Sequence, residues 1–474
     1  MIKPVIPEFA VVGHPNEGKS SVLSTLAEDD SVRISPIPGE TTECRSFPVM
    51  IDGREIIRFV DTPGFQNPRN TLRWMQNYEG PDEDMVKEFV RAHEKDPAFR
   101  DDCELLTPLL DGAGIIFVID GSRPVRNMDR AEMEILRLTG RPRMAIINSK
   151  EDDTSYREQW QNEFRKHFNS IRIFNSNRAT YAERISLLES LKSIDQNLQD
   201  VLEMVISAFK RDWAARNQQT ADAIVSMLTD ILSYRRTEPC PDRTNESALR
   251  EKLHKKYVRF VAKKEQKTYR QIRSVFKHNI FNYDLPDHSI LQEDLFSERT
   301  WQFLGLNKTQ LVMAAALGGA SIGAGVDVAA GGISFGVFST LGGVIGAAGT
   351  ALKGKEFLSG VRLLGIKLDH QKLQVGPVNN IQFLYILLDR ALIFYSHIIN
   401  WAHGRRDYEE RTSITEEAGT KQGYATGLGS TARKTCRIFF KAIQGDDQDA
   451  LDQTADALKR MLSESLGSIS RDTR

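Results

Sequence analysis

The first feature of the sequence that could do chemistry is a glycine-rich octapeptide near the N-terminus. It reads Gly13-His14-Pro15-Asn16-Glu17-Gly18-Lys19-Ser20 and satisfies the P-loop pattern G-x-x-x-x-G-K-[ST]. In this pattern glycines let the backbone wrap a phosphate, whose charge meets several N–H groups and the N-terminus of the following helix. Lys19 would neutralise the β- and γ-phosphates, and the Ser20 hydroxyl would hold Mg²⁺. The octapeptide and the adjacent Ser21 therefore predict a site for a nucleoside triphosphate.

A carboxylate and two threonines follow in the order that such a site requires. Asp61 opens the tetrapeptide Asp-Thr-Pro-Gly directly after an expected strand, where its carboxylate can reach Mg²⁺ through water. Gly64, which closes the tetrapeptide, has an N–H that can sense the γ-phosphate. The polar loop at residues 38–43 lies between the two motifs, and its Thr41 and Thr42 can also reach Mg²⁺. Downstream of a P-loop, this combination is a strong indication of a magnesium–nucleotide site.

Alternating secondary structure would position these motifs. Residues 1–198 alternate short β-rich runs with helical patterns, the rhythm of a mostly parallel sheet with flanking crossover helices. A strand that ends at Val12 and a helix that begins at Lys19 would enclose the phosphate-binding loop. We therefore predict an α/β domain of the P-loop type. The expected strands are residues 9–12, 47–51, 56–60, 114–119, 144–147 and 171–174, and the expected helices are residues 19–27, 129–138, 156–168 and 181–194.

One connection in this domain is unusually long. Residues 68–108 are helix-prone, and residues 79–104 carry ten acidic side chains against four Lys or Arg. Two interpretations of this acidic insertion stay open. It is either a solvated helical insertion or a mobile surface for an effector.

The chain changes character after about residue 200, where the pattern is helical almost throughout and has no strand rhythm. It predicts a mainly α-helical domain with expected helices at residues 201–234, 381–401, 431–443 and 447–466. Its divisions are a helical linker and basic helix (199–300), an apolar hairpin and core helix (301–405) and charged helices (406–474). Residues 250–277 hold eleven Lys or Arg and two acids. Either this basic face is merely solvated, or it has an anionic partner: lipid headgroups, RNA or the acidic insertion.

Residues 311–352 form the most unusual segment. They contain one charge, Asp327, and eleven glycines, several of them spaced as GxxxG, which permits close contact between helices. A turn at Asp327 and Gly331–Gly332 would make a helical hairpin. Its first limb, at about 24 Å, is shorter than the roughly 30 Å hydrocarbon core of a bilayer. The segment is either a buried or conditionally inserting hairpin, or a constitutive membrane hairpin.

Composition limits the class of protein. With 40% hydrophobic and 27% charged residues the chain is neither disordered nor fibrous, and a net charge of −1 gives no global attraction to nucleic acid or membrane. The four cysteines lie far apart without a CxxC pair, which fits a reduced compartment. The N-terminus lacks an apolar signal core. We expect a cytoplasmic protein, with peripheral or hairpin attachment to the inner membrane as the alternatives for contact with lipid.

With these motifs in place, the N-terminal domain resembles the translation-factor-related GTPases of the Era and TrmE type. In that family the P-loop commonly reads GxPNxGKS, the first switch PGTT followed by a charged residue, and the second switch DTPG. The resemblance implies a domain that binds GTP or GDP with Mg²⁺, hydrolyses GTP and has nucleotide-gated switch loops. Glu40 stands where the family has threonine, so either Thr41 or Thr42 takes the switch role. The remainder of the chain resembles the uncharacterised helical, glycine-rich C-terminal domain of some bacterial Era-like GTPases.

The base-reading motif departs from the family pattern. The family reads guanine with [NT]KxD after the fifth strand, whereas this chain has Asn-Ser-Lys-Glu-Asp at residues 148–152. Either Ser-Lys-x-Asp ends at Asp152, which we prefer, or Asn148 comes first and the rest is shifted by one. The last family motif, Ser-Ala-x, is reduced to Ser176. The residues expected to contact the base are therefore Asn148, Lys150, Asp152 and Ser176.

Two residues bear on the rate of hydrolysis. Phe65 follows Gly64, where many switch GTPases have the glutamine that orients water, so we expect slow intrinsic hydrolysis. Asn16 occupies the position that ligates K⁺ in TrmE-like and related cation-dependent GTPases. It either binds K⁺ beside the phosphates or hydrogen-bonds the switch loop. The residues predicted to act in catalysis are Asn16, Lys19, Thr41, Thr42 and Gly64.

Three functions stay open at this point. The leading one is a GTPase switch whose helical C-terminal domain is the output, with membrane association as its use. The second is an RNA- or ribosome-associated GTPase that binds phosphates through residues 250–277, and the third is a P-loop ATPase. The partners considered are guanine nucleotide, an anionic membrane surface, RNA or the ribosome, and a second copy in a nucleotide-dependent homodimer.

Overall fold

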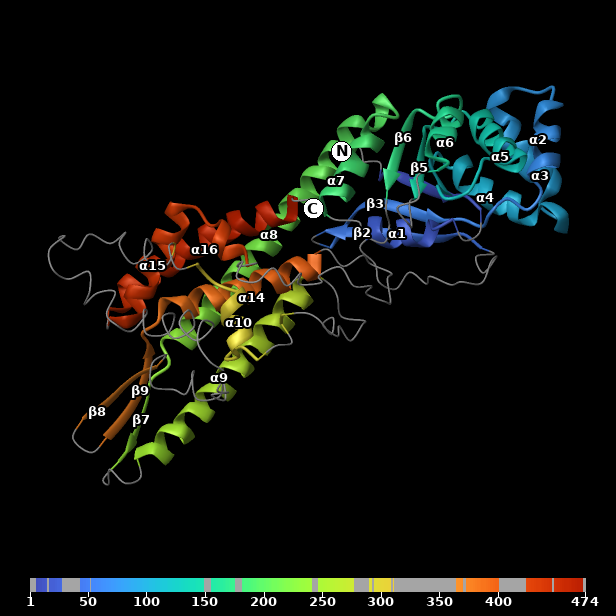
Figure 1. Cartoon of the computed structure of the whole chain (residues 1–474). Coiled ribbons are helices and arrows are strands. Elements are labelled where there is room, and N and C mark those ends of the chain that lie inside the picture. The colour runs from blue at the N-terminus through green and yellow to red at the C-terminus, as the bar shows by residue number, and fades with distance from the viewer. Residues whose placement is uncertain are drawn as a thin grey trace, which may run out of the picture. The chain divides into compact units, whose positions relative to one another are not determined.

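The computed structural model divides the chain into two compact units. The first comprises Met1–Ala214 with two short segments near the C-terminus, and the second comprises Ala215–Ile398 with Tyr408–Ile469. The residues that it describes are 6–14, 17–27, 43–51, 53–148, 155–174, 181–240, 246–276, 290–291, 294–307, 310, 364–369, 372–399, 423–445 and 447–471. Each unit is described by itself (Figure 1).

The first unit is built on a six-stranded sheet in the order β2-β3-β1-β4-β5-β6. All neighbouring strands are parallel except β2 and β3, which form an antiparallel pair. The predicted α/β domain with a mostly parallel sheet is therefore confirmed. The strands are β1 (Glu8–Val12), β2 (Arg45–Ile51), β3 (Arg54–Asp61), β4 (Gly114–Asp120), β5 (Arg143–Asn148) and β6 (Ser170–Phe174).

Helices cover both faces of this sheet, and their apolar sides form two cores. Strand β4 is buried over residues 114–119 because side chains on both of its faces meet helices, as in other parallel sheets. One core joins the sheet to α1, α7 and the start of α8. The other joins it to α3 (Met85–His93), α4 (Arg100–Leu110), α5 and α6. The helices are α1 (Lys19–Ala27), α5 (Asn127–Leu138), α6 (Arg157–Phe164), α7 (Tyr181–Lys192) and α8 (Gln196–Leu232), of which the part up to Ala214 belongs to this unit.

The acidic insertion between β3 and β4 is helical and has apolar contacts of its own. Trp74 stacks on Tyr78 and meets Phe89 edge to face, while His93 contacts Phe89 and Phe99. The last helix, α4, packs against the sheet through leucines that are fully buried. The elements of the insertion are α2 (Pro68–Gln76), η1 (Asp82–Asp84), α3 (Met85–His93), η2 (Pro97–Phe99) and α4 (Arg100–Leu110).

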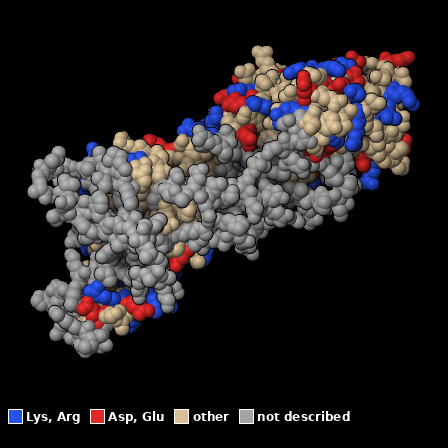
Figure 2. Space-filling view, viewed as in Figure 1, with Lys and Arg blue, Asp and Glu red and all other residues tan. Residues whose placement is uncertain are grey.

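Charges of both signs share the surface of the first unit. On the face that Figure 2 presents, Lys and Arg are interspersed with Asp and Glu, and tan residues separate them. This agrees with the balance of 63 basic and 64 acidic residues in the whole chain. Attraction to a polyanion would therefore have to come from a local group of cations.

The second unit is mainly helical, as predicted, but it also contains a sheet that the sequence pattern did not predict. Three antiparallel strands pair in the order β7-β9-β8. The sequence pattern missed this sheet because β7 (Arg236–Pro239) is polar apart from its proline and lies far along the chain from β9, with which it pairs, while β8 and β9 are a single hairpin within a largely helical region. The other elements are α9 (Glu246–Val275), α10 (Glu298–Phe303), β8 (Leu364–Asp369), β9 (Lys372–Val378), α14 (Ile381–Ile399), η4 (Tyr424–Gly427), α15 (Ser430–Gln444) and α16 (Gln448–Arg471).

Helix α14 lies in the core of the second unit. Among the described residues it is the one helix long and apolar enough to cross a membrane, and 83% of its apolar 18-residue window is buried inside the protein. Asp389 and Arg390 interrupt its apolar sequence, and both have partners within the fold: Asp389 accepts hydrogen bonds from the N–H groups of Gly305 and Ala425, and Arg390 pairs with Glu265. These contacts mark α14 as a core helix. The predicted glycine-rich hairpin at residues 311–352 lies outside the described residues.

Candidate nucleotide-binding site

The phosphate-binding loop connects β1 to α1, and its two glycines have backbone conformations that other residues rarely adopt. Gly13 has a φ of +149°, and a Cβ atom there would stand 2.2 Å from the carbonyl oxygen of Val118. Gly18 has a φ of +94° and precedes the first residue of α1. Both glycines are required because the chain turns sharply here while it lies against β4. Pro15 and Asn16 lie outside the described residues.

Lys19 is the central side chain of the site. Its ammonium group donates hydrogen bonds to the carbonyl oxygens of Gly13, at 2.7 Å, and His14, at 3.0 Å. Only 8% of the residue is exposed. Burial lowers the pKa of Lys19, while the carboxylates of Asp61 and Glu132 act in the opposite direction. A buried ammonium group held by two carbonyls of the loop is positioned to meet a phosphate of opposite charge.

Asp61 and Ser20 supply oxygen atoms next to this lysine. Asp61 ends β3 and is 6% exposed, and the following Thr62 hydroxyl donates to the carbonyl oxygen of Val11 at 2.8 Å, which joins β3 to β1. Ser20 and Ser21 lie in the first turn of α1 and are half-buried. One carboxylate and one hydroxyl fit Mg²⁺, which keeps water and phosphate oxygens in its shell. Thr41 and Thr42, the other predicted ligands, lie outside the described residues.

Glu17, within the loop, is held by groups that the sequence analysis did not select. Arg123 donates from Nε to Glu17 at 2.6 Å and from both Nη atoms to Asp129 at 2.8 and 2.9 Å. The backbone N–H of Asp120 also donates to Glu17, and that of Arg126 donates to Asp129. Burial raises the pKa of Glu17, and Arg123 opposes that rise. These bonds fix the loop to the segment between β4 and α5.

A second buried group of charges lies behind His14. The Nε2 atom of His14 is 3.0 Å from a carboxylate oxygen of Glu132 and 3.5 Å from one of Asp129, and both acids are fully buried on α5. Burial, together with the charge of Asp129, raises the pKa of Glu132 well above its usual range. Burial would also raise the pKa of Asp129, but hydrogen bonds from His14 and Arg123 outweigh it and lower that pKa. The pKa values of these two neighbouring buried acids are therefore shifted in opposite directions, because the ionised form of one disfavours ionisation of the other.

Of the four residues expected to read the base, the structure describes one. Asn148 ends β5, is fully buried and donates from Nδ2 to the carbonyl oxygen of Glu17 at 3.1 Å. This bond brings the end of β5 against the phosphate-binding loop. Lys150, Asp152 and Ser176 lie outside the described residues.

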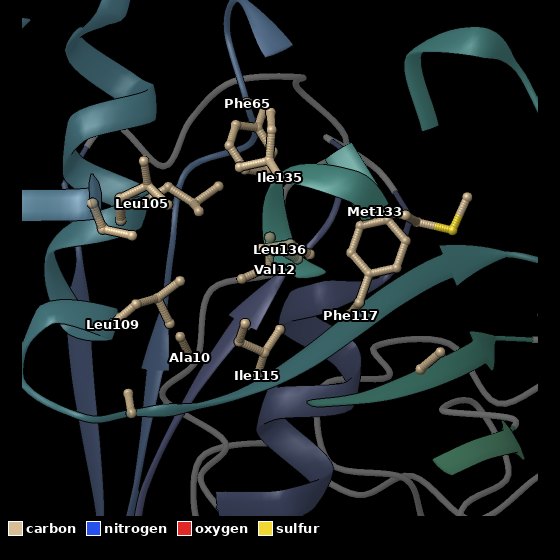
Figure 3. Close-up of a cluster of buried hydrophobic side chains, with 14 of the residues drawn as sticks. Ala10, Val12, Phe65, Leu105, Leu109, Ile115, Phe117, Met133, Ile135 and Leu136 are labelled. Atoms are coloured by element: carbon tan, nitrogen blue, oxygen red, sulfur yellow. The ribbon is translucent and has the colours of Figure 1, made fainter. Parts of the chain in front are cut away.

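Phe65 lies in the apolar core beside the site. It is 7% exposed and belongs to the cluster formed by α3, α4, α5, α6 and the sheet. Figure 3 shows its ring next to Ile135, in the same cluster as Leu105 and Val12. Gly64, the residue before it, is half-buried. Phe65 thus anchors the end of the Asp-Thr-Pro-Gly segment by packing.

Comparison with known families agrees with this geometry. Residues 8–149 match the family described as "50S ribosome-binding GTPase", and residues 161–466 match the family described as "Domain of unknown function (DUF3482)". The first match spans the sheet from β1 to β5 with the phosphate-binding loop. The second covers more than half of the chain and most of the helical region.

Two curated relatives are similar to about a third of this chain. GTPase Der of Thermotoga petrophila is 28% identical over 161 residues, which are 34% of this chain and 31% of that protein. The tRNA modification GTPase MnmE of Syntrophus aciditrophicus is 27% identical over 150 residues, which are 31% of this chain and 26% of that protein. The chain thus spans less than a third of the length of either relative.

Among solved structures, Era in complex with MgGDPNP and a 16S ribosomal RNA fragment is 20% identical, with a TM-score of 0.26, over 43% of this chain and 56% of that one. The predicted resemblance is confirmed by the family match and the relatives. The N-terminal domain is a bacterial P-loop GTPase domain of the Era and TrmE type, and the chain belongs to the family described as "Domain of unknown function (DUF3482)".

Proposed function

We propose that this protein is a molecular switch that binds GTP, hydrolyses it to GDP and phosphate, and uses its helical C-terminal domain as the output. One observation carries the proposal: the buried ammonium group of Lys19 is held between two carbonyls of a P-loop, with the acid of β3 close enough to act on its pKa. GTPases among the curated relatives support the same activity.

The reaction follows from what these residues can hold. A water oxygen attacks the γ-phosphorus, the bond to the β–γ bridging oxygen breaks, and GDP and inorganic phosphate leave. Lys19 and the N–H groups at the start of α1 bind the phosphates and stabilise the charge that develops on them. Ser20 and Asp61 would hold Mg²⁺, whose charge neutralises the β- and γ-phosphates. Because the Phe65 ring is packed in the core, it cannot orient the water, and we expect slow turnover without a further group.

A potassium ion is our proposal for that further group. Asn16 lies in the loop that wraps the phosphates, and a cation there would supply positive charge to the transition state. GTP turnover at constant ionic strength should therefore be faster in KCl than in NaCl or CsCl. Asn16→Ala should lose this stimulation but keep its affinity for GDP. Equal rates in the three salts would refute the role of K⁺ and leave the GTPase assignment intact.

Guanine preference rests on the segment after β5. A site that pairs a ring N–H discriminates strongly against a base that cannot make the pair. We expect GTP to compete at least tenfold better than ATP, and Asp152→Asn to weaken that preference. If Glu151→Gln weakens it instead, the register that begins with Asn148 is the right one. Equal competition by ATP and GTP would favour a P-loop ATPase.

We propose contact with the membrane as the leading use of the output. The apolar residues 311–352, with lysines at positions 308 and 353, support it. A cytoplasmic protein that reaches the inner membrane through this segment would float with anionic liposomes in one nucleotide state. A protein that stays away from liposomes with both GTP analogue and GDP would refute this use. The molar mass of the protein without liposomes, measured by light scattering with GTP analogue and with GDP, would reveal a nucleotide-dependent homodimer.

A second candidate function is supported by the charges of α9. Five exposed cations lie seven, four, four and three residues apart, so that they follow one face of the helix for about 27 Å. None of them has an ion pair with another residue that the structure describes, whereas four other cations of α9 are paired with acids. The apolar face of α9, with Leu253, Tyr257 and Val261, is buried in the unit and cannot enter a bilayer. The five residues, the basic stripe, are Lys252, Arg259, Lys263, Lys267 and Arg270.

A ribose-phosphate backbone can follow such a stripe without burial of an apolar face, and RNA is the candidate partner. The family description "50S ribosome-binding GTPase" supports ribosomal RNA in particular. Neutralising Arg259, Lys263 and Lys267 to Gln should lower RNA affinity about tenfold or more and reduce the salt slope by about three. The matched control neutralises Lys255, Lys256 and Lys264, which are paired with acids. Equal losses in the two triple variants would refute a specific role for the stripe, and binding to liposomes alone would favour the membrane.

A further inference from the structure

Helix α4 of the acidic insertion contacts the chain immediately after each of the two polar motifs. Its leucines pack against the sheet in the core of the first unit. Two of its carboxylates, Asp102 and Glu104, reach backbone groups at residues 66–67 and at residue 44. Residues 66–67 follow the Asp-Thr-Pro-Gly motif, and residue 44 follows the loop with Thr41 and Thr42.

Asp102 is fully buried and uses both of its carboxylate oxygens. Oδ2 accepts hydrogen bonds from the backbone N–H groups of Gln66 and Asn67, both at 3.0 Å, and Oδ1 accepts one from the Thr71 hydroxyl at 2.9 Å. The acid therefore holds the start of α2, which has no side-chain cap of its own. Burial raises the pKa of Asp102, and these three bonds oppose the rise.

Glu104 makes the corresponding contact with the chain that follows the loop with Thr41 and Thr42. Its Oε1 accepts from the backbone N–H of Cys44 at 2.8 Å, and its backbone carbonyl accepts from the Cys44 thiol at 3.2 Å. Burial and the Glu104 carboxylate raise the pKa of Cys44 to about 12, so the thiol stays protonated and can donate. Cys44 directly precedes β2, so Glu104 fixes the point where that loop rejoins the sheet.

We propose that α4 couples the two nucleotide-sensing loops to the acidic insertion, with Asp102 as the positioning residue that transmits movement of the Asp-Thr-Pro-Gly segment to α2. The proposal rests on the switch function proposed above. A helix cap alone would need only the bonds of Asp102 to α2. Helix capping does not explain the second contact. Glu104, on the same short helix, accepts a hydrogen bond from Cys44, which follows the loop with Thr41 and Thr42.

The surface that this coupling would change is the one formed by the aromatic side chains of the insertion. A hollow of about 570 Å³ is lined there by residues of α2, including Arg73 and Trp74, and by His93 and Phe99 from the rest of the insertion. Because α2 contributes one side of this hollow, a shift of α2 changes its shape. Trp74 is half-buried against Tyr78 and Phe89, so its fluorescence should report such a shift.

The test measures Trp74 fluorescence in the full-length protein with GDP and with a non-hydrolysable GTP analogue, beside nucleotide affinity by calorimetry. Wild type should show a difference between the two nucleotides that Trp74→Phe removes. Asp102→Ala should reduce this difference at least threefold and lower kcat with KM within threefold of wild type. Asp102→Asn can still accept the two N–H bonds and donate to Thr71, and it should restore the signal. The matched control is Asp101→Ala, the neighbouring acid on α4.

Two further variants protect the test against a folding defect. If Asp102→Ala does not fold, Thr71→Val, which loses one of the three bonds, should reduce the fluorescence difference in part. Glu104→Ala should reduce it as well, since the backbone N–H of Cys44 then loses its side-chain acceptor. A full signal in folded Asp102→Ala, or no Trp74 signal in a wild type that binds both nucleotides, would overturn the coupling. A wild type that binds neither nucleotide would overturn the switch function itself.

Discussion

Both units of this protein bury charged side chains, but they do so in different ways. In the first unit Glu17, Lys19 and Asp61 gather where β1 and β3 end, and backbone carbonyls and the neighbouring loop hold them. In the second unit Arg390 and Glu265 form a pair at 2.8 Å between α14 and α9, and Arg390 also donates to the carbonyl oxygens of residues 290 and 291.

The difference separates a ligand site from an architectural one. At the ends of parallel strands, charges face a loop and a helix N-terminus, which together bind anions. Within the helical unit each charge of the pair meets protein groups on several sides, so the pair fixes how α14 lies against α9. Burial of charge alone therefore does not indicate function. A ligand site is indicated only when the buried charges also face a loop and a helix N-terminus.

The largest effect is expected from breaking the architectural pair. Arg390→Ala leaves Glu265 buried without its cation, which should lower the free energy of unfolding of the second unit by about 3–5 kcal/mol. Chemical denaturation followed by circular dichroism measures it. The double variant Arg390→Met with Glu265→Leu should recover most of the loss. If the single variant is as stable as wild type, the pair does not hold the helices together.

Phe65 tests the same distinction in the first unit, because it lies beside the ligand site but is packed in the core. If its position served catalysis, Phe65→Gln would raise GTP turnover. Because the ring is buried in the core, we expect instead that the free energy of unfolding falls by about 3 kcal/mol without faster turnover. Phe65→Leu, which keeps an apolar side chain, should lose less stability. A stable and faster Phe65→Gln variant would show that the side chain can turn toward the nucleotide.

Because of His397 on α14, we expect the free energy of unfolding of the second unit to depend on pH. Burial lowers its pKa to about 4, so the unfolded chain, with the ordinary pKa of 6.5, binds the proton more tightly. Stability from this group is complete above pH 6.5 and is lost as the pH falls toward 4, by about 2 kcal/mol between pH 7 and pH 5. Denaturation curves of wild type and His397→Gln at these two pH values isolate the contribution of His397 to the free energy of unfolding. Parallel pH profiles would contradict it.

The smallest expected effect concerns Cys44. Its raised pKa keeps the thiol protonated, so alkylation by iodoacetamide at pH 8 should be slow although the residue is half-buried. Glu104→Gln removes one cause of the raised pKa and should speed modification several-fold. Peptide mass spectrometry identifies the modified cysteine, and the buried Cys436 serves as an internal control. Fast labelling of Cys44 in wild type would mean that Glu104 does not hold this segment.

The strands of the first unit could be predicted because they carry continuous apolar runs, as β4 does between Gly114 and Ile119. The phosphate-binding loop was equally clear from the spacing of Gly13, Gly18 and Lys19. The strand β7 was missed because its four residues, Arg-Thr-Glu-Pro, look like a turn until β9 pairs with them. Local pattern cannot show a pairing made across so much of the chain.

The partners of the site were missed for a related reason. Arg123 is 106 residues from Glu17, and only the fold brings the two together. Asp102 and Glu104 lie in a run of acids that is typical of a solvated surface, and no spacing marks these two carboxylates as the ones that accept hydrogen bonds from the backbone elsewhere in the unit. An acid inside the phosphate-binding loop was the one available signal, since a buried Glu17 needs a compensating cation.

The central claim is that the charges buried at the ends of β1 and β3 form a triphosphate site. Calorimetric titration of wild type and Lys19→Ala with GTP in Mg²⁺ tests it most directly. We predict that Lys19→Ala loses at least about a hundredfold in affinity, or about 2.7 kcal/mol, while its unfolding transition is unchanged or moves to higher stability because a buried ammonium group is gone. Affinity within about threefold of wild type, in a folded Lys19→Ala protein, would contradict the account.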